Sequence, residues 1–286
     1  MKNNLSPGRL FRQVLESEQP LQIIGTINAY CATMAKRAGF RAIYLSGAGV
    51  ANASYGIPDL GMTTLADVLI DVKRITANCD LPLLVDIDTG WDDMAKTVRT
   101  MCDAGVAAVH FEDQVAKKRC GHRPNKSIVT SDEMVTRIKQ AVAGRADDDC
   151  FLIARTDAIA NEGLAAAISR AQAYVAAGAD GIFAEAITAE EDYATFCREV
   201  SVPVLANMTE FGHSPLLTAS QLERLGVAMV LYPLSAFRAM NQAAWDIFCA
   251  IREQGTQQSL LDKMQDRVTL YDFLDYEAQE AQIDRS

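Results

Sequence analysis

The residue best suited to chemistry in this sequence is a cysteine surrounded by cations. Residues 117–126 read Lys-Lys-Arg-Cys-Gly-His-Arg-Pro-Asn-Lys, so Cys120 lies among five Lys and Arg side chains. Nearby positive charge stabilises a thiolate, and Gly121 and Pro124 disfavour a regular helix through the segment. We therefore expect a loop in which Cys120 acts as an acid/base group or a nucleophile and His122 orients or tunes the thiol. The alternative, a solvated charged loop with an incidental cysteine, explains this clustering less well.

Acidic side chains recur where apolar runs of the sequence end. Asp86 and Asp88 close one run, and Glu112 and Glu185 close two others. Residues two apart on an extended strand point to one face, so the two aspartates are expected to do so. Carboxylates gathered in this way repel one another unless a cation joins them, and an all-oxygen donor set favours Mg²⁺ or Mn²⁺ over Zn²⁺. The sequence predicts a metal site of Asp86, Asp88 and, through water, Glu112; solvated strand-end acids are the alternative.

Neutral and cationic donors stand at the ends of other apolar runs. They are Ser46 with Gly47, Arg155, and Asn207 with Thr209. A substrate that carries carboxylates needs such donors, and the planar guanidinium of Arg155 can engage a carboxylate with two parallel hydrogen bonds. We expect these residues to bind a small di- or tricarboxylate.

Short apolar runs alternate with longer amphipathic segments along the chain. Nearly continuous apolar runs are typical of strands buried on both faces. Apolar stripes in residues 65–75 and 164–175 indicate helices, and Thr130, Thr188 and Thr218 each precede Glu or Gln by three residues, as in a capping box. The eight candidate strands are residues 21–27, 42–45, 81–87, 107–111, 151–154, 181–184, 202–206 and 227–232.

Eight such units predict an α/β fold, a closed (β/α)8 TIM-type barrel with its active site at the carboxyl ends of the strands. An open doubly wound sheet is the runner-up, but residues 25–28 lack the Gly-rich phosphate motif expected after its first strand. Helical stretches at 235–253 and 260–273 and an acidic tail at 275–286, expected to be solvated or disordered, follow the eighth run. We predict one domain over residues 1–286, with a helical extension from about residue 235 that packs on another subunit.

The length, composition and net charge of the chain exclude several classes of function. At 286 residues and 49% hydrophobic, the chain is large enough to bury one substantial core. Its formal net charge of −10 argues against nucleic acid as a partner. The N-terminus lacks the apolar stretch of a signal peptide, and no run approaches the ~20 apolar residues of a membrane helix, so we expect a cytoplasmic protein with no membrane partner. The other six cysteines lack metal-type spacing and are expected to be inert.

Seven motifs lie at or near the ends of the apolar runs. They are 44–47 (Tyr-Leu-Ser-Gly), 58–61 (Pro-Asp-Leu-Gly), 86–88 (Asp-Ile-Asp), 112–114 (Glu-Asp-Gln), the basic segment 117–126, 154–157 (Ala-Arg-Thr-Asp) and 232–238 (Tyr-Pro-Leu-Ser-Ala-Phe-Arg). Together they resemble the isocitrate lyase / phosphoenolpyruvate mutase superfamily and, within it, the 2-methylisocitrate lyases. The Cys-Gly-His segment is specific to the lyase branch, and its extension through residues 123–126 favours methylisocitrate over isocitrate.

The resemblance implies a Mg²⁺-dependent cleavage of 2-methylisocitrate to pyruvate and succinate in the methylcitrate cycle of propionate catabolism. It also implies a homotetramer in which C-terminal helices are exchanged between subunits. Asp86 and Asp88 would hold the metal, and Ser46 and Gly47 the pyruvate-forming end of the substrate. Cys120 would lie on a lid with Gly121. The resemblance also implies further contacts with the substrate, from Arg155, Glu185, Asn207, Thr209, Arg238 and Arg267.

The implied reaction needs two proton transfers. Cys120 is the expected proton donor to the succinate carbanion, and Tyr44 is our candidate for the base that removes the hydroxyl proton. Two features depart from the family pattern: residues 89–97 form a shorter loop that contains Trp91, and Ala48 stands where glycine is common. A related 2-hydroxy-acid lyase of the dimethylmalate or isocitrate type, or a catalytically impaired binding relative, are the alternatives.

Overall fold

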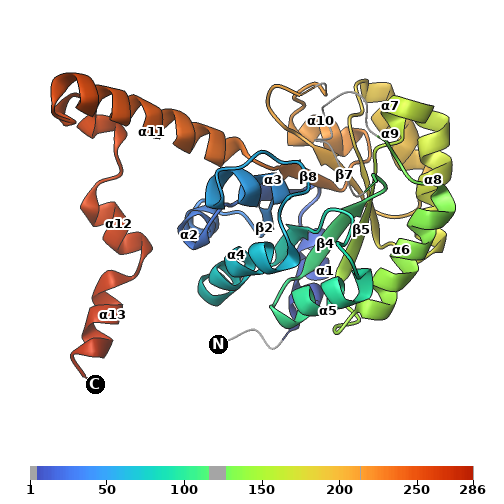
Figure 1. Cartoon of the computed structure of the whole chain (residues 1–286), viewed down its shortest axis with the longest axis horizontal. Coiled ribbons are helices and arrows are strands. Elements are labelled where there is room, and N and C mark those ends of the chain that lie inside the picture. The colour runs from blue at the N-terminus through green and yellow to red at the C-terminus, as the bar shows by residue number, and fades with distance from the viewer. Residues whose placement is uncertain (1–4, 116–126, 213, 286) are drawn as a thin grey trace.

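The computed structural model describes residues 5–115, 127–212 and 214–285. Its strands are parallel and pair in chain order, and β1 also pairs with β8, so the sheet closes into a barrel (Figure 1). Ile23 of β1, for example, lies opposite Ala42 on one side and Leu231 on the other. The predicted barrel is confirmed. The strands are β1 (Leu21–Gly25), β2 (Ala42–Leu45), β3 (Leu83–Asp86), β4 (Ala108–Glu112), β5 (Phe151–Thr156), β6 (Gly181–Ala184), β7 (Val204–Asn207) and β8 (Met229–Tyr232).

Helices surround the barrel and connect successive strands (Figure 1). Those between β1 and β8 are α2 (Ala29–Arg37), α3 (Gly47–Gly49), the π-helical turn η1 (Val50–Ser54), α4 (Leu65–Asn78), α5 (Met94–Asp103), α6 (Ser131–Gly144), α7 (Ile159–Glu162), α8 (Leu164–Ala176), α9 (Glu190–Glu199) and α10 (Ala219–Arg224). Before them comes α1 (Pro7–Ser17), and after them come α11 (Ser235–Gln254), the 3₁₀ turn η2 (Gln258–Lys263), α12 (Arg267–Phe273) and α13 (Tyr276–Ile283).

The side chains of alternate strand residues belong to two separate apolar layers. In β3, Leu83 and Val85 join the layer between strands and helices, whereas Leu84 joins the barrel interior. The interior layer also contains apolar side chains of α1, and the ring of Phe11 packs 5.2 Å from that of Phe151 at the start of β5. Helix α1 therefore closes the amino-terminal end of the barrel and leaves the carboxyl ends of the strands for a site.

Three capping boxes were predicted from the sequence, and the N-termini of α6, α9 and α10 can be compared with them. Thr218 forms the complete box with Gln221, and the Thr130 side chain accepts a hydrogen bond from the backbone of Glu133. The prediction at Thr188 is wrong, because α9 begins one residue later than that box requires, with Ala189 at its N-cap. The two predicted apolar stripes are confirmed as α4 and α8.

Residues 235–285 form a C-terminal arm that extends away from the barrel (Figure 1). Its first helix, α11, exposes Trp245 and Phe248, which are 64% and 66% accessible. The predicted helix at 260–273 is instead broken into η2 and α12, because Asp266 caps a new helix by accepting a hydrogen bond from the backbone of Thr269. The tail was predicted to be solvated or disordered, and it is exposed and largely helical, since α13 lies within it.

Within the described ranges, none of the helices combines the length and the apolarity that crossing a bilayer requires.

Candidate active site

Two aspartates converge on a single glycine at the carboxyl end of the barrel. Asp86 is the last residue of β3, and its carboxylate accepts hydrogen bonds from the backbone of Gly47 at 3.2 Å and of Asp88 at 3.0 Å. A Cβ atom added at Gly47 would lie 3.1 Å from an oxygen of each aspartate. The absence of a side chain at Gly47 therefore leaves the space onto which both carboxylates face.

The aspartates meet for a reason other than the predicted one. Asp88 does not continue the extended strand, because it has a φ of +51°, in the left-handed region. The rule that residues two apart on a strand share a face thus does not apply to this pair. Its orientation comes from a turn after β3, in which the Asp88 carbonyl accepts from the Glu112 backbone at 2.9 Å.

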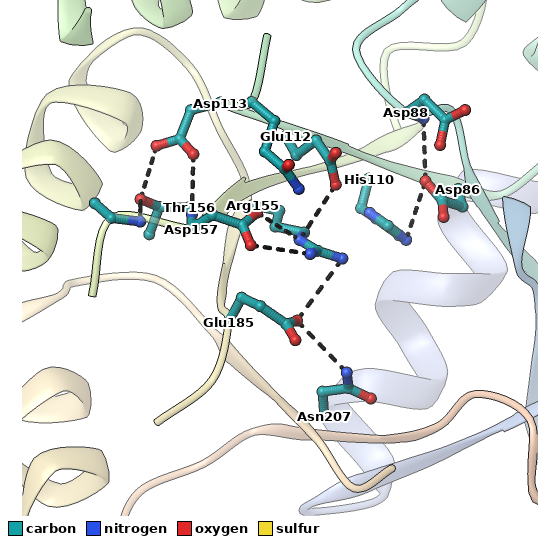
Figure 2. Close-up of polar contacts among 12 residues, drawn as sticks. Asp86, Asp88, His110, Glu112, Asp113, Arg155, Thr156, Asp157, Glu185 and Asn207 are labelled. Atoms are coloured by element: carbon teal, nitrogen blue, oxygen red, sulfur yellow. Dashed lines mark hydrogen bonds and ion pairs between the residues drawn. The ribbon is translucent and has the colours of Figure 1, made fainter. Parts of the chain in front are cut away.

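Arg155 on β5 is the centre of a buried ion cluster (Figure 2). Its guanidinium makes two hydrogen bonds to the Asp157 carboxylate, at 3.0 and 3.1 Å. It also lies 3.3 Å from a Glu112 oxygen and 3.7 Å from a Glu185 oxygen. Arg155 is therefore a cation that joins carboxylates from three strand ends, a role that the sequence analysis had given to a metal alone.

Burial and the neighbouring carboxylates have opposite effects on the pKa of Arg155. Burial alone would lower the pKa of Arg155, but the Asp157, Glu185 and Glu112 carboxylates outweigh it and raise that pKa well above its ordinary value. The guanidinium is thus permanently charged and held in place. Asp157 occupies the edge of the guanidinium formed by Nε and Nη2, so a substrate carboxylate would meet the edge formed by Nη1 and Nη2, which also presents two parallel N–H groups.

A tyrosine and a histidine lie side by side inside the barrel. The Tyr44 hydroxyl is 2.9 Å from Nε2 of His110, and the rings stack with centroids 5.6 Å apart. The same nitrogen lies 3.7 Å from an Asp86 oxygen (Figure 2). Both rings are almost fully buried. A proton can therefore move between Tyr44 and His110 next to the aspartate pair.

The neutral donors predicted from the sequence lie on the same rim. Ser46 caps α3, where its hydroxyl accepts from the Gly49 backbone at 3.2 Å. Asn207 ends β7, and its amide donates to Glu185 at 3.5 Å. Thr209 is buried two residues further on. The structure thus brings these residues to the carboxyl ends of β2 and β7, at the same end of the barrel, as expected from the fold.

A buried carboxylate supports the cluster from behind. Asp113 follows β4 and accepts hydrogen bonds from Thr156 Oγ1 at 2.8 Å, the Asp157 backbone at 2.9 Å and the Tyr174 hydroxyl at 2.9 Å. Burial raises the pKa of Asp113, and these hydrogen bonds oppose that rise. Because Asp157 in turn holds Arg155, Asp113 fixes the guanidinium indirectly.

Of the remaining five predicted site residues, only Arg238 lies beside this rim in the described chain, because its partner Glu210 directly follows Thr209. Arg238 on α11 is half-exposed and pairs with Glu210 at 3.5 Å. Arg267 begins α12 in the C-terminal arm, which lies outside the ring of barrel helices (Figure 1). Cys120, Gly121 and His122 lie outside the described residues. The roles assigned to these five residues stay predictions.

The all-oxygen pair at Gly47 also has the chemistry for a metal ion. Within the described residues, no three His, Cys, Asp or Glu side chains are close enough to form a closed metal site. Mg²⁺ does not need one, because it usually keeps several waters and takes one or two protein carboxylates. Asp86 and Asp88 therefore fit Mg²⁺. Glu112, which is engaged with Arg155, fits only a role through water.

Comparisons with known proteins identify the family. A family model described as phosphoenolpyruvate phosphomutase matches residues 11–252. The chain belongs to this family. A protein named 2-methylisocitrate lyase from Shewanella oneidensis is 56% identical over 283 residues, which are 98% of this chain and 97% of that protein.

Solved structures of the family share the fold over almost their whole length. A 2,3-dimethylmalate lyase superposes with a TM-score of 0.90 at 32% identity, covering 98% of this chain and 96% of the other. A phosphonopyruvate hydrolase, solved in complex with oxalate and Mg²⁺, has a TM-score of 0.85 at 28% identity, covering 97% and 98%. The family fold thus accommodates several related reactions, and one member was solved with a divalent metal.

The sequence analysis assigned no role to three residues of this phosphomutase-family site, His110, Asp113 and Asp157, although the last two lie within its motifs. His110 interrupts an otherwise apolar run, which could have indicated a polar group inside the barrel. Asp157 stands two residues after Arg155, the spacing at which side chains share a strand face. Asp113 gives no such local indication, because its partners come from β5 and α8.

Proposed function

We propose that this chain is a 2-methylisocitrate lyase, which cleaves 2-methylisocitrate into pyruvate and succinate in propionate catabolism. The observation that carries the proposal is the 56% identity, over nearly the whole chain, to a protein of that name. The chemistry of the rim supports it, since carboxylates for a divalent ion, donors for a carboxylate substrate and a tyrosine–histidine pair lie together.

Asp86 and Asp88 would hold Mg²⁺, with Glu112 acting through water and Mn²⁺ as a possible substitute. The Asp86 carboxylate is fixed before any ion arrives, because the backbone N–H groups of Gly47 and Asp88 both donate to it. When bound, the ion would act as a Lewis acid toward the oxygen that becomes the pyruvate carbonyl. The side chains of the protein would carry out every other step.

Substrate carboxylates would be bound by donors on the same rim. Ser46 and Gly47 would take the pyruvate-forming end, at the start of α3. Arg155 would present a fixed positive charge to the succinate-forming end, and fixed charge stabilises a developing anion without reorganisation. The other proposed contacts are Gly121, Glu185, Asn207, Thr209, Arg238 and Arg267.

The proton transfers would use two ends of the site. Tyr44 would remove the hydroxyl proton of the substrate as the carbon–carbon bond breaks, with His110, 2.9 Å away, as the group that shares the proton. Cys120 would donate a proton to the succinate carbanion from the basic segment, where His122 would orient or tune its thiol.

The assembly that we propose is a homotetramer in the cytoplasm with exchanged C-terminal arms. It rests on α11, whose Trp245 and Phe248 are largely exposed in one chain, because exposed apolar faces mark interaction sites. Burial of this face against a second copy would also bring Arg267 of α12 toward a neighbouring barrel. Light scattering coupled to size exclusion measures the number of subunits directly.

The test of the function is pyruvate release from 2-methylisocitrate, with isocitrate and 2,3-dimethylmalate in parallel. We expect release from the methylated tricarboxylate alone, with Mg²⁺ present, and its loss in excess chelator. Release from dimethylmalate instead would favour the activity named for the solved relative. Absence of turnover with all three acids would contradict the lyase proposal and favour a binding protein.

Substitution of Cys120 tests the proton transfer separately from the binding of substrate. Cys120→Ser should lower kcat by orders of magnitude and leave the fold intact, because serine is a far weaker acid than a thiol. Cys249→Ser, on the C-terminal arm, is the matched control and should keep wild-type kcat. A Cys120→Ser protein with wild-type kcat would exclude Cys120 as the proton donor.

A further inference from the structure

The turn between β3 and α5 has an unusual backbone. Within four residues, Asp88, Gly90 and Trp91 have positive φ angles of 51°, 89° and 51°. Glycine adopts this region freely, but a bulky side chain such as that of tryptophan rarely does, because the conformation is strained. The conformation of Trp91 must therefore be held by contacts outside the turn.

Hydrogen bonds fix the turn to its own strand and helix. The Gly90 backbone donates to the Ile87 carbonyl at 2.8 Å, and the buried Thr97 hydroxyl of α5 donates to the Gly90 carbonyl at 3.0 Å. On the barrel side, the carbonyl of Asp88 accepts from the Glu112 backbone. The position of the Asp88 carboxylate is thus set by a short, tightly bonded turn that continues into Trp91.

The indole of Trp91 ties this turn to a second segment. Its Nε1–H donates to the Thr63 carbonyl at 2.8 Å, and its ring packs against the outer apolar layer. Residues 55–64 run between η1 and α4, and Leu60 and Met62 within them are more than half exposed. Asn52 holds the start of this segment through the Ile57 carbonyl, and Trp91 holds its end.

The two segments enclose a cavity. It has a volume of about 510 Å³ and is lined by Met62, Thr63, Thr89, Trp91 and Lys96, among others. Removal of the indole would open this cavity further and free both the end of the 55–64 segment and the turn that carries Asp88. Both segments could then move, because unfilled space already lies next to the indole of Trp91.

We propose that Trp91 is a positioning residue that holds Asp88 in its metal-binding orientation and the 55–64 segment beside it. The inference rests on the proposed function, because it gives Asp88 the role of metal ligand. A displaced ligand weakens binding more than it weakens the fold.

The experiment uses the two tryptophans of the chain. In Trp245→Phe, which removes the exposed indole on the arm, Trp91 is the remaining fluorophore. We expect its emission to change saturably with Mg²⁺ and to return with chelator. Trp91→Phe keeps a ring but loses the N–H, and calorimetry should show a 10–100-fold loss of Mg²⁺ affinity, the range found when supporting groups of a metal site are removed. Its Mg²⁺ requirement for turnover should rise by the same factor, with kcat at saturating Mg²⁺ changed less.

The outcomes separate the two proposals. Wild-type protein that binds no Mg²⁺ would overturn the metal assignment in the proposed function, and this inference with it. Wild-type protein that binds Mg²⁺ while Trp91→Phe binds it equally well would overturn the inference alone. A purely structural role for Trp91 would lower the melting temperature without changing the Mg²⁺ affinity of the folded protein, and that result also counts against it.

Discussion

Gly47→Ala tests whether the space between the two aspartates is the functional feature of the rim. The added methyl group would lie 3.1 Å from an oxygen of Asp86 and from one of Asp88, so both carboxylates must move by a few tenths of an ångström. The 3.2 Å hydrogen bond from the Gly47 backbone to Asp86 would be strained as well. Displaced supporting groups cost a metal site about 10–100-fold in affinity, which corresponds to about 1.4–2.7 kcal/mol.

The assay is a calorimetric titration of Gly47→Ala with Mg²⁺, followed by pyruvate release over a range of Mg²⁺ concentrations. Gly49→Ala is the matched control on the same short helix. Its methyl group would meet Cβ of Ser46 at 3.3 Å and Cδ2 of Leu234 at 3.4 Å, away from both carboxylates. Equal Mg²⁺ affinity in Gly47→Ala and wild type would refute the assignment of this space to the metal. Equal losses in both variants would show a general effect of crowding α3.

Two further predictions concern buried groups. Asp113→Ala should lower the free energy of unfolding in urea by about 3–5 kcal/mol, because it leaves buried donors, among them the Tyr174 hydroxyl, without their acceptor. Cys102 should be alkylated by iodoacetamide at lower pH than Cys197. A hydrogen bond with the Cys150 thiol lowers the pKa of Cys102, whereas burial raises the pKa of Cys197 to about 11, so the reactive thiolate of Cys102 forms first as pH rises.

Each of these predictions has its own control. Glu162→Ala removes a half-exposed carboxylate that pairs with Arg170 at 2.8 Å in the same network, and should cost less than about 1 kcal/mol. A similar loss in Asp113→Ala would show that burial of that carboxylate matters little. Peptide mass spectrometry distinguishes the thiols, and alkylation of Cys197 before Cys102 on raising pH would contradict the assigned order.

The barrel, and the end of it at which the site lies, could be predicted from the order of residues alone. Strands buried on both faces must be apolar throughout, so eight apolar runs were visible without any knowledge of long-range contacts. Since parallel strands end at one rim, the polar residues that close those runs, such as Asp86, Glu112 and Arg155, had to meet there. Capping at Thr218 is equally local, because donor and acceptor lie within one turn.

The pairing of the buried charges and the left-handed turns could not be predicted in this way, because they depend on long-range contacts. Arg155 faces Asp157, Glu112 and Glu185 because strand register brings three strand ends together, and register is a property of the whole sheet. The left-handed Asp88 bonds to the backbone of Glu112 on the next strand, and Trp91 contacts Thr63, which lies 28 residues away in the chain. Local propensity is set by neighbouring residues, whereas the energy of a buried charge or a strained turn is set by groups that only folding brings near.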